Sequence, residues 1–138
     1  MSIFSFRKDE ILRKKKFIDR LFAEGSSFYI YPFKVFYLIT PLEADFPAQV
    51  MISVGKRSFR NAVDRNRIRR QVREAYRLNK QPLYEFLVSK NSQCVLAFIY
   101  TANIHLPGAE HQIKIKAAVK RLCNEIERKL NNQLPVLS

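Results

Sequence analysis

The pattern of hydrophobic and polar positions predicts three elements in the first half of the chain. Apolar residues recur at helical intervals over about 9–25. Residues 28–40 are aromatic or β-branched on both alternating faces, which predicts a strand covered on both sides. Pro32 has no N–H to donate to a ladder, so regular pairing should begin after it. Residues 48–55 alternate as a half-exposed strand does, and 41–47 is the loop between the two strands.

The second half of the chain continues with helices around one more strand. Helical spacing runs from about 62 to 80, where it should stop because Pro82 disfavours helical geometry at the residue before it. Residues 82–89 fit a short helix with this proline in the first turn. The continuous apolar run at 93–101 is typical of a buried strand. Residues 110–131 place apolar side chains along one face of a last helix.

These elements predict an α+β fold, a two-layer α/β sandwich in which helices and a small mixed sheet share one core. The expected order is helix, strand, strand, helix, strand, helix. With 138 residues, 47% of them hydrophobic, the chain is predicted to be a single domain over 1–138, with 1–8 and 132–138 as loose ends. No apolar run approaches the roughly 18 residues of a membrane span. The N-terminus lacks the pattern of a signal peptide, so a cytoplasmic location is expected.

Charge changes this picture, because it concentrates in one stretch. The chain carries a formal net charge of +13, and residues 56–80 hold ten basic side chains against two acidic ones. At 3.6 residues per turn, Ile68, Val72, Ala75 and Asn79 share one face of the helix predicted there. The roughly opposite face carries Asn66, Arg70, Arg73 and Arg77, with Arg69 and Lys80 flanking them.

This basic face is typical of nucleic-acid binding. Solvated helix faces usually mix charges of both signs, whereas Glu74 alone relieves the arginines here. Arginine outnumbers lysine in the stretch, and its planar guanidinium pairs bidentately with phosphate oxygens. A clustered basic helix is the electrostatic footprint of proteins that bind nucleic acids.

The first predicted helix has candidate ends and a basic cluster of its own. Asp9 is placed to cap its N-terminus, and Gly25 is placed to end it. The cluster Arg-Lys-Lys-Lys at 13–16 forms either a solvated outer face or an RNA contact, and the pattern does not decide between the two.

Side chains capable of catalysis are sparse. His105 and His111 flank a Pro-Gly loop, and nothing in the sequence positions them with a partner. The twelve acidic residues are scattered, without the spacing of a two-metal site. Cys94 and Cys123 lack a CxxC or histidine-rich neighbourhood and are predicted to be buried free thiols. We therefore expect a binding surface without catalytic or metal-ligating residues.

One contiguous motif resembles a known family. The run Phe59-x-x-Ala62-x-x-Arg65-Asn66-Arg67-Ile68-Arg69-Arg70-x-Val72-Arg73 is similar to the signature of the bacterial ribonuclease P protein component. The resemblance implies a fold like the second domain of ribosomal protein S5, with a left-handed β-α-β crossover. It also implies a protein subunit that assists a catalytic RNA, which uses Mg2+ to remove the 5′ leader of precursor transfer RNA. The partners would be that RNA subunit and precursor transfer RNA, with no obligate protein partner and no activity from the protein alone.

The resemblance also implies which residues meet RNA. The residues that match its RNA-facing motif and the basic residues beside it are Lys56, Arg57, Arg65, Asn66, Arg67, Arg69, Arg70, Arg73 and Arg77. The family's leader-binding cleft lies between the sheet, the first helix and the arginine-rich helix. Phe22 and Tyr37 resemble its aromatic wall, and Ile18 stands where many relatives carry phenylalanine. Plain core packing is the alternative for Phe22 and Tyr37.

Two other functions fit part of the pattern. Charge and size alone would equally permit a ribosomal or other structural RNA-binding protein on a similar fold. A reader of duplex DNA, with the arginine-rich helix in a major groove, fits less well. Most positions of that helix are arginines suited to phosphate, which leaves few side chains for base edges.

Overall fold

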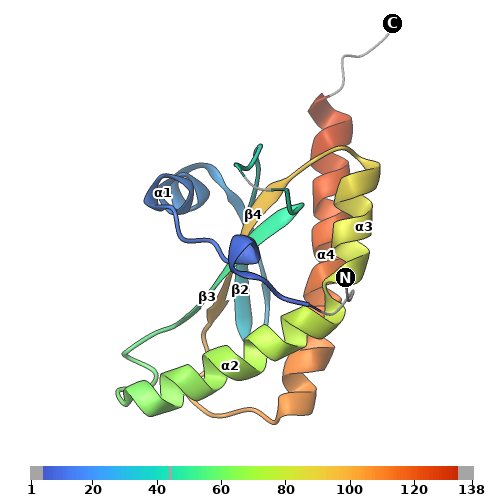
Figure 1. Ribbon diagram of the computed structural model, residues 1–138. Coiled ribbons are helices and arrows are strands. Elements are labelled where there is room, and N and C mark those ends of the chain that lie inside the picture. Colours follow the sequence, from blue (N-terminus) through green and yellow to red (C-terminus); the bar gives the residue numbers. More distant parts are fainter. Residues whose placement is uncertain (1–4, 44, 134–138) are drawn as a thin grey trace, which may run out of the picture.

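The computed structural model describes residues 5–43 and 45–133, which form four helices and a four-stranded sheet (Figure 1). In chain order the elements are a 3-10 turn η1 (Lys8–Glu10), α1 (Lys15–Glu24), β1 (Ser26–Ile30), β2 (Phe33–Ile39), β3 (Ala48–Val54), α2 (Ala62–Asn79), α3 (Gln81–Ser89), β4 (Cys94–Tyr100) and α4 (Gly108–Gln133). The predicted α+β class is confirmed. Within the described ranges no helix is both long enough and apolar enough to cross a bilayer.

The sheet is mixed, with strand order β1-β2-β4-β3. The pairs β1–β2 and β2–β4 are antiparallel, and β3–β4 is parallel. Parallel neighbours need a long crossover, and the chain supplies it with α2 and α3 between β3 and β4. The helix-rich crossover therefore brings α2 against the end of the sheet where β3 finishes (Figure 1).

Helices lie against both faces of the sheet. Buried residues of α2, α3 and α4 form the main core with one face, and α1 packs across part of the other (Figure 1). In β2, Val35 belongs to the main core, whereas Phe36 and Leu38 pack in the cluster beneath α1. The prediction of a strand covered on both sides is therefore confirmed for the part of β2 beneath α1, whereas Lys34 on the same face is exposed.

The run at 28–40 is two strands, so its prediction as one strand was wrong. A turn at Tyr31-Pro32 joins β1 to β2, and Phe28 lies opposite Val35 in the resulting hairpin. Aromatic and β-branched residues continue through the turn, so the hydrophobic pattern shows no break there. Proline lacks the N–H of a ladder, which is why Pro32 sits in the turn. The hairpin adds β1 as an edge strand.

The start of the first helix also differs from its prediction. The α-helix begins at Lys15, and the residues around Asp9 form the short turn η1 instead of a helix cap. Ile11 makes an isolated parallel bridge with Val50, so this segment runs along β3 as extended chain. Gly25 ends α1 as predicted, and its amide donates to the carbonyl of Leu21 at 2.9 Å.

A buried ion pair anchors this N-terminal segment. Lys80 is 3% exposed and Glu10 is 0% exposed, and the lysine ammonium donates to the carboxylate. Tyr84 donates its hydroxyl to the same carboxylate at 2.7 Å, and the ammonium also donates to the carbonyl of Ser5. The placement of Lys80 on the exposed basic stripe was therefore wrong. This lysine joins the N-terminal segment to the junction of α2 and α3.

Candidate nucleic-acid interface

Helix α2 presents one apolar and one basic face, as its spacing predicts. Its N-terminus is capped by Asn61, whose side-chain oxygen accepts from the amide of Val63 at 2.9 Å. The side chains of α2 that pack in the core are Ile68, Val72, Ala75 and Tyr76. The last of these was missed by the sequence analysis. With this face buried, the opposite face is held towards solvent.

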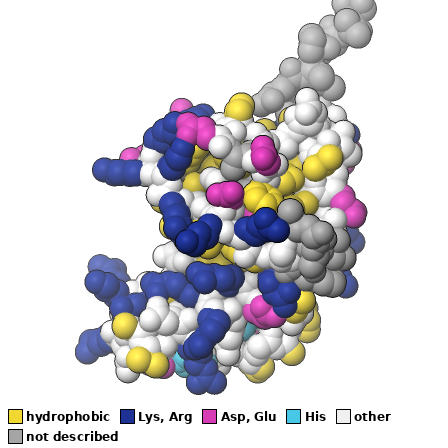
Figure 2. All heavy atoms as spheres, in the orientation of Figure 1, with side chains coloured by type: hydrophobic (Ala, Val, Ile, Leu, Met, Phe, Trp, Pro, Cys, Tyr) yellow, Lys and Arg dark blue, Asp and Glu magenta, His cyan; other side chains and the backbone are white. Residues whose placement is uncertain are grey.

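We call the basic side of α2 the arginine face; it consists of Asn66, Arg67, Arg69, Arg70, Arg73 and Arg77. Figure 2 shows Lys and Arg side chains gathered along this helix. Arg67, Arg70 and Arg73 are exposed, and none of them has an acidic partner within the described ranges. Arg67 and Arg70 also line a hollow of about 390 Å³ beside the first turn of α4. These guanidinium groups are free to pair with an external anion.

The other members of this face have partners within the chain. Arg77 forms an ion pair with Glu74 at 2.5 Å, and its hydrogen bonds hold the pKa of that carboxyl below its usual range. Arg69 donates to the side-chain oxygen of Asn66 at 2.8 Å. These contacts orient side chains on the helix surface without neutralising the three exposed arginines.

Arg65 braces the segment that leads into α2. Its Nη1 donates to the carbonyls of Phe59 and Arg60 at 2.8 and 2.9 Å. Lys56 and Arg57 are exposed in the turn between β3 and this segment. The predicted basic pair thus lies between the end of β3 and the start of α2.

The two histidines are held apart by different contacts. His105 lies with its Nε2 3.3 Å from a carboxylate oxygen of Asp64, and its ring is 4.9 Å from that of Phe59. This links the loop before α4 to the first turn of α2. His111 is buried instead, with neither ring nitrogen hydrogen-bonded within the described residues. Among those residues no group of three or more His, Cys, Asp or Glu could hold a metal ion.

The buried His111 predicts a pH dependence of stability. Burial lowers the pKa of this imidazole, against the opposing influence of Glu110. The unfolded chain therefore binds a proton more readily, and the free energy of unfolding should fall as pH drops through about 6.5. Each unit of pKa difference is worth about 1.4 kcal/mol. Denaturant unfolding between about pH 5 and 8 measures the slope.

The matched variant for this prediction is His111→Phe. Its ring suits a site lined by Phe33 and Tyr100, and it does not titrate. The variant should show a flatter pH profile than wild type. Equal slopes in wild type and variant would contradict the role of His111.

The face of the sheet that carries α1 is partly open. Phe22 on α1 is 44% exposed, and its ring meets that of Phe36 edge-on, with centroids 4.9 Å apart. Ile18 is half-buried one turn earlier and packs in the same cluster. In Figure 2 the surface is hollowed on this side, between basic side chains of α1 and of α2. The predicted aromatic residue on α1 is therefore partly exposed at the surface.

Tyr37 does not share that surface, so its placement beside Phe22 was wrong. It is 1% exposed and packs in the main core on the opposite face of the sheet. Its hydroxyl donates to Glu125 on α4 at 3.0 Å, and burial raises the pKa of the phenol to about 12. Strand alternation brings Phe36 to the open face instead. Positions 36 and 37 are both aromatic. Only the fact that Phe36 faces the same side of the sheet as Leu38, which packs beneath α1, could have identified Phe36 as the ring on the open face.

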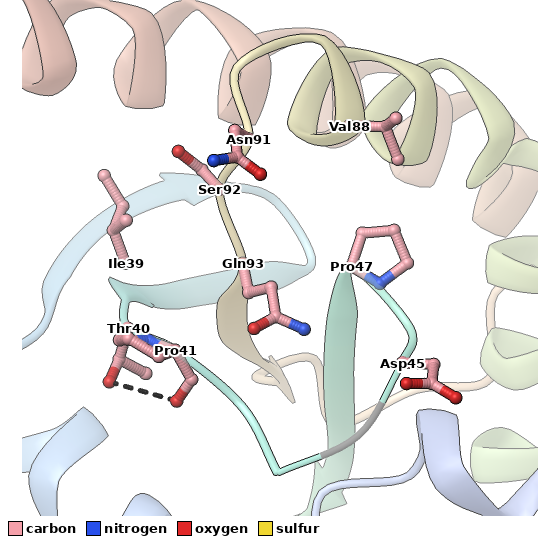
Figure 3. A pocket seen from close by; sticks show the side chains of 9 residues that line it. All are labelled: Ile39, Thr40, Pro41, Asp45, Pro47, Val88, Asn91, Ser92 and Gln93. Carbon is pink, nitrogen blue, oxygen red and sulfur yellow. Dashed lines mark hydrogen bonds between the residues drawn. The ribbon is translucent and has the colours of Figure 1, made fainter.

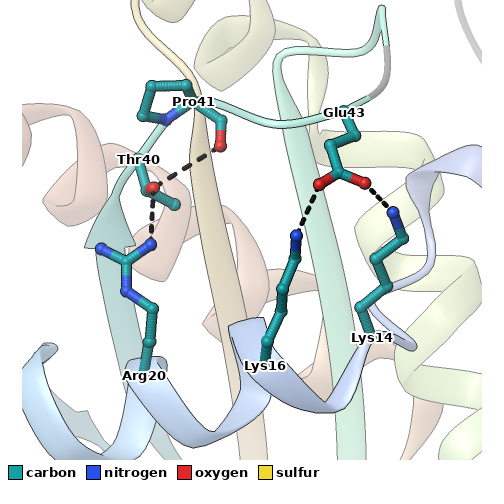
Figure 4. Close-up of polar contacts among 6 residues, drawn as sticks. All are labelled: Lys14, Lys16, Arg20, Thr40, Pro41 and Glu43. Atoms are coloured by element: carbon teal, nitrogen blue, oxygen red, sulfur yellow. Dashed lines mark hydrogen bonds and ion pairs between the residues drawn. The ribbon is translucent and has the colours of Figure 1, made fainter.

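Ion pairs tie α1 to the loop between β2 and β3 (Figure 4). Lys14 and Lys16 both pair with Glu43, the latter at 2.5 Å, and Arg20 donates to the hydroxyl of Thr40 at 3.2 Å. Exposed pairs of this kind contribute about 0–1 kcal/mol each. Half of the basic cluster at 13–16 thus faces this loop.

A separate cavity of about 420 Å³ lies at the far end of the sheet, between this loop and the turn after α3 (Figure 3). The amide of Gln93 accepts from the N–H of Leu42 at 2.8 Å and donates to the carbonyl of Phe46 at 3.0 Å. This side chain therefore holds the loop in place. The cavity contributes no residue to the arginine face or to the open face of the sheet.

Comparison with known proteins points to one family. The family model named Ribonuclease P matches residues 6–104. The ribonuclease P protein component of Porphyromonas gingivalis (strain ATCC 33277) is 37% identical over 100 residues, covering 72% of this chain and 73% of that protein. The corresponding protein of Chlorobaculum tepidum is 33% identical over 136 residues, covering 93% and 84%.

Solved structures show the same fold. The RNase P protein of Staphylococcus aureus superposes with a TM-score of 0.64 at 21% identity, covering 82% of this chain and 94% of that one. The RNase P protein from Thermotoga maritima gives a TM-score of 0.65 at 21% identity, covering 81% and 96%.

Proposed function

Because this chain belongs to the ribonuclease P protein family, we propose that it binds the catalytic RNA through the arginine face and the 5′ leader of precursor transfer RNA on the open face of the sheet. The RNA subunit then removes the leader, and the protein assists by binding both RNAs. The Mg2+ ions of the reaction would be held mainly by the RNA subunit. We place the complex in the cytoplasm and expect no obligate protein partner.

The observation that carries this proposal is the set of exposed arginines on α2. Arg67, Arg70 and Arg73 lie on one helix side with no acidic partner in the described part of the chain. Like charges this close oppose folding, and a polyanion relieves the repulsion. Guanidinium groups match phosphate oxygens bidentately, and the phosphate backbone dominates affinity for nucleic acids.

The open face of the sheet supports the second contact. Phe22 and Phe36 offer ring surface on the face of the sheet that carries α1. On this side, basic side chains of α1 and of α2 border a hollow (Figure 2). Single-stranded RNA binds such surfaces because unpaired bases stack on aromatic rings while cations attract the phosphates. A 5′ leader is a single strand, and stacking tolerates any base. We infer that affinity follows leader length more than leader sequence.

Reconstitution with the cognate RNA subunit tests the proposal. With Mg2+ at low ionic strength, the complex should bind precursor more tightly than mature transfer RNA, and RNA-free protein should cleave neither. Phe22→Ala should lose about 1–3 kcal/mol of precursor affinity and leave mature product binding unchanged, because one stacking platform is removed. Affinity measurements on both RNAs check this.

Tyr37→Ala is the contrasting variant. Its ring lies in the core, so it should lower the melting temperature and affect precursor and product alike. A complex of wild-type protein that binds precursor and product equally would overturn the leader contact. Cleavage by RNA-free protein would contradict the proposal that the RNA subunit removes the leader and the protein only binds.

A further inference from the structure

The open face of the sheet extends past Phe36 to the edge strand β1. In the β1–β2 hairpin, Ser27 lies opposite Phe36 and Tyr29 lies opposite Lys34. Side chains alternate along a strand, so Tyr29, Lys34 and Phe36 all point to the face that carries α1. Neither the hydrophobic pattern nor the family resemblance singles out Tyr29 or Lys34.

Tyr29 is an exposed ring in a fixed position. It is 52% exposed, and its hydroxyl lies 3.0 Å from the hydroxyl oxygen of Thr101, which itself bonds to the carbonyl of Pro32 at 2.8 Å. Each link restricts the ring without covering its surface. An aromatic side chain held this way has little conformational freedom to lose when a base stacks on it.

Lys34 lies between this ring and the Phe22–Phe36 pair. Its ammonium is 5.2 Å from the centroid of Phe36, and the side chain is exposed. Same-face neighbours on a strand are about 7 Å apart. The face thus carries an aromatic platform, a cation and a second aromatic platform in succession. Sheets that bind single-stranded RNA stack two or three bases on aromatic side chains in this way.

We propose that Tyr29 stacks a further leader base and that Lys34 binds a phosphate between this base and the one on Phe22–Phe36. The proposal rests on the leader contact of the proposed function. It assigns the complex a leader-binding track that crosses the sheet from α1 to the edge strand. The track ends near Thr101, at the end of the sheet where β3 leads towards α2.

The test uses the reconstituted complex with precursors of increasing leader length and with mature transfer RNA. Tyr29→Ala should lose about fivefold or more in affinity once the leader is long enough to reach the ring. Tyr29→Phe should lose much less affinity than Tyr29→Ala, because it keeps the ring and loses only the hydroxyl that restricts it. Lys34→Gln should make the log–log salt dependence of precursor affinity shallower by about one. Ile113→Ala, an exposed apolar residue on α4, is the control and should change nothing.

Three outcomes would overturn the site. An equal loss for mature transfer RNA would mean that the ring meets the catalytic RNA or serves the fold. An unchanged affinity of Tyr29→Ala at every leader length, with wild type still preferring precursor, would remove Tyr29 from the track. A wild-type complex without any leader preference would overturn the proposed leader contact itself, and this site with it.

Discussion

Lys80→Ala is expected to lower the free energy of unfolding by about 3–5 kcal/mol, the cost typical of removing one partner of a buried ion pair. The carboxylate of Glu10 is 0% exposed and would lose the ammonium that neutralises it. The hydroxyl of Tyr84 would remain as a donor, but it carries no charge. Denaturant unfolding, followed by far-UV circular dichroism, measures the loss.

The matched control is Lys16→Ala. This lysine also pairs with a glutamate, Glu43, but both side chains are more than half exposed. The control should cost about 0–1 kcal/mol, because water solvates the carboxylate that is left. A double variant, Lys80→Met with Glu10→Gln, should recover part of the loss, since it leaves no unpaired charge. If Lys80→Ala cost no more than Lys16→Ala, the pair would not anchor the N-terminal segment.

The second large effect concerns binding. Arg70→Ala combined with Arg73→Ala is expected to weaken affinity for the RNA subunit about a hundredfold. Each charge-assisted contact contributes about 1.5 kcal/mol, and both side chains are exposed on the arginine face. The melting temperature should stay close to that of wild type, because neither side chain packs in the core.

A charge-matched control distinguishes direct contacts between the arginine face and RNA from the attraction due to the net charge of the protein. Lys116→Ala with Lys120→Ala removes the same two charges from exposed positions on α4. This control should weaken binding much less, since its charges act on RNA only over a distance and are screened by salt. Equal losses in the two double variants would show that net charge, and not the arginine face, determines affinity.

Local hydrophobic patterns predicted the helices and most strands. Each helix buries one side, and the strands show either alternation or a continuous apolar run. In α2, Ile68, Val72 and Ala75 recur at helical spacing and are buried. The helix predicted from this spacing, about 62–80, agrees with the observed Ala62–Asn79. The β1–β2 hairpin was hidden because hydrophobic residues continue through its turn at Pro32. A pattern of burial cannot reveal a change of direction when both strands are apolar.

The positions of the candidate site residues were predicted where they depend on one helix and missed where they depend on distant contacts. The predicted RNA-facing residues, carried by a contiguous motif, all lie on α2 or in the turn before it. Lys80 followed the same periodicity but is drawn into the core by Glu10, 70 residues away. Phe36 and Tyr37 are adjacent aromatics, and only the packing of α1 decides which of them reaches the open face.

The salt dependence of binding between this protein and the catalytic RNA tests the central claim most directly. Binding through phosphates releases counterions, so log affinity should fall linearly with log salt concentration. The Arg70→Ala, Arg73→Ala double variant should show a slope shallower by about two than wild type, with an unchanged melting temperature. A slope equal to that of wild type would mean that the arginine face is only solvated and does not hold the RNA.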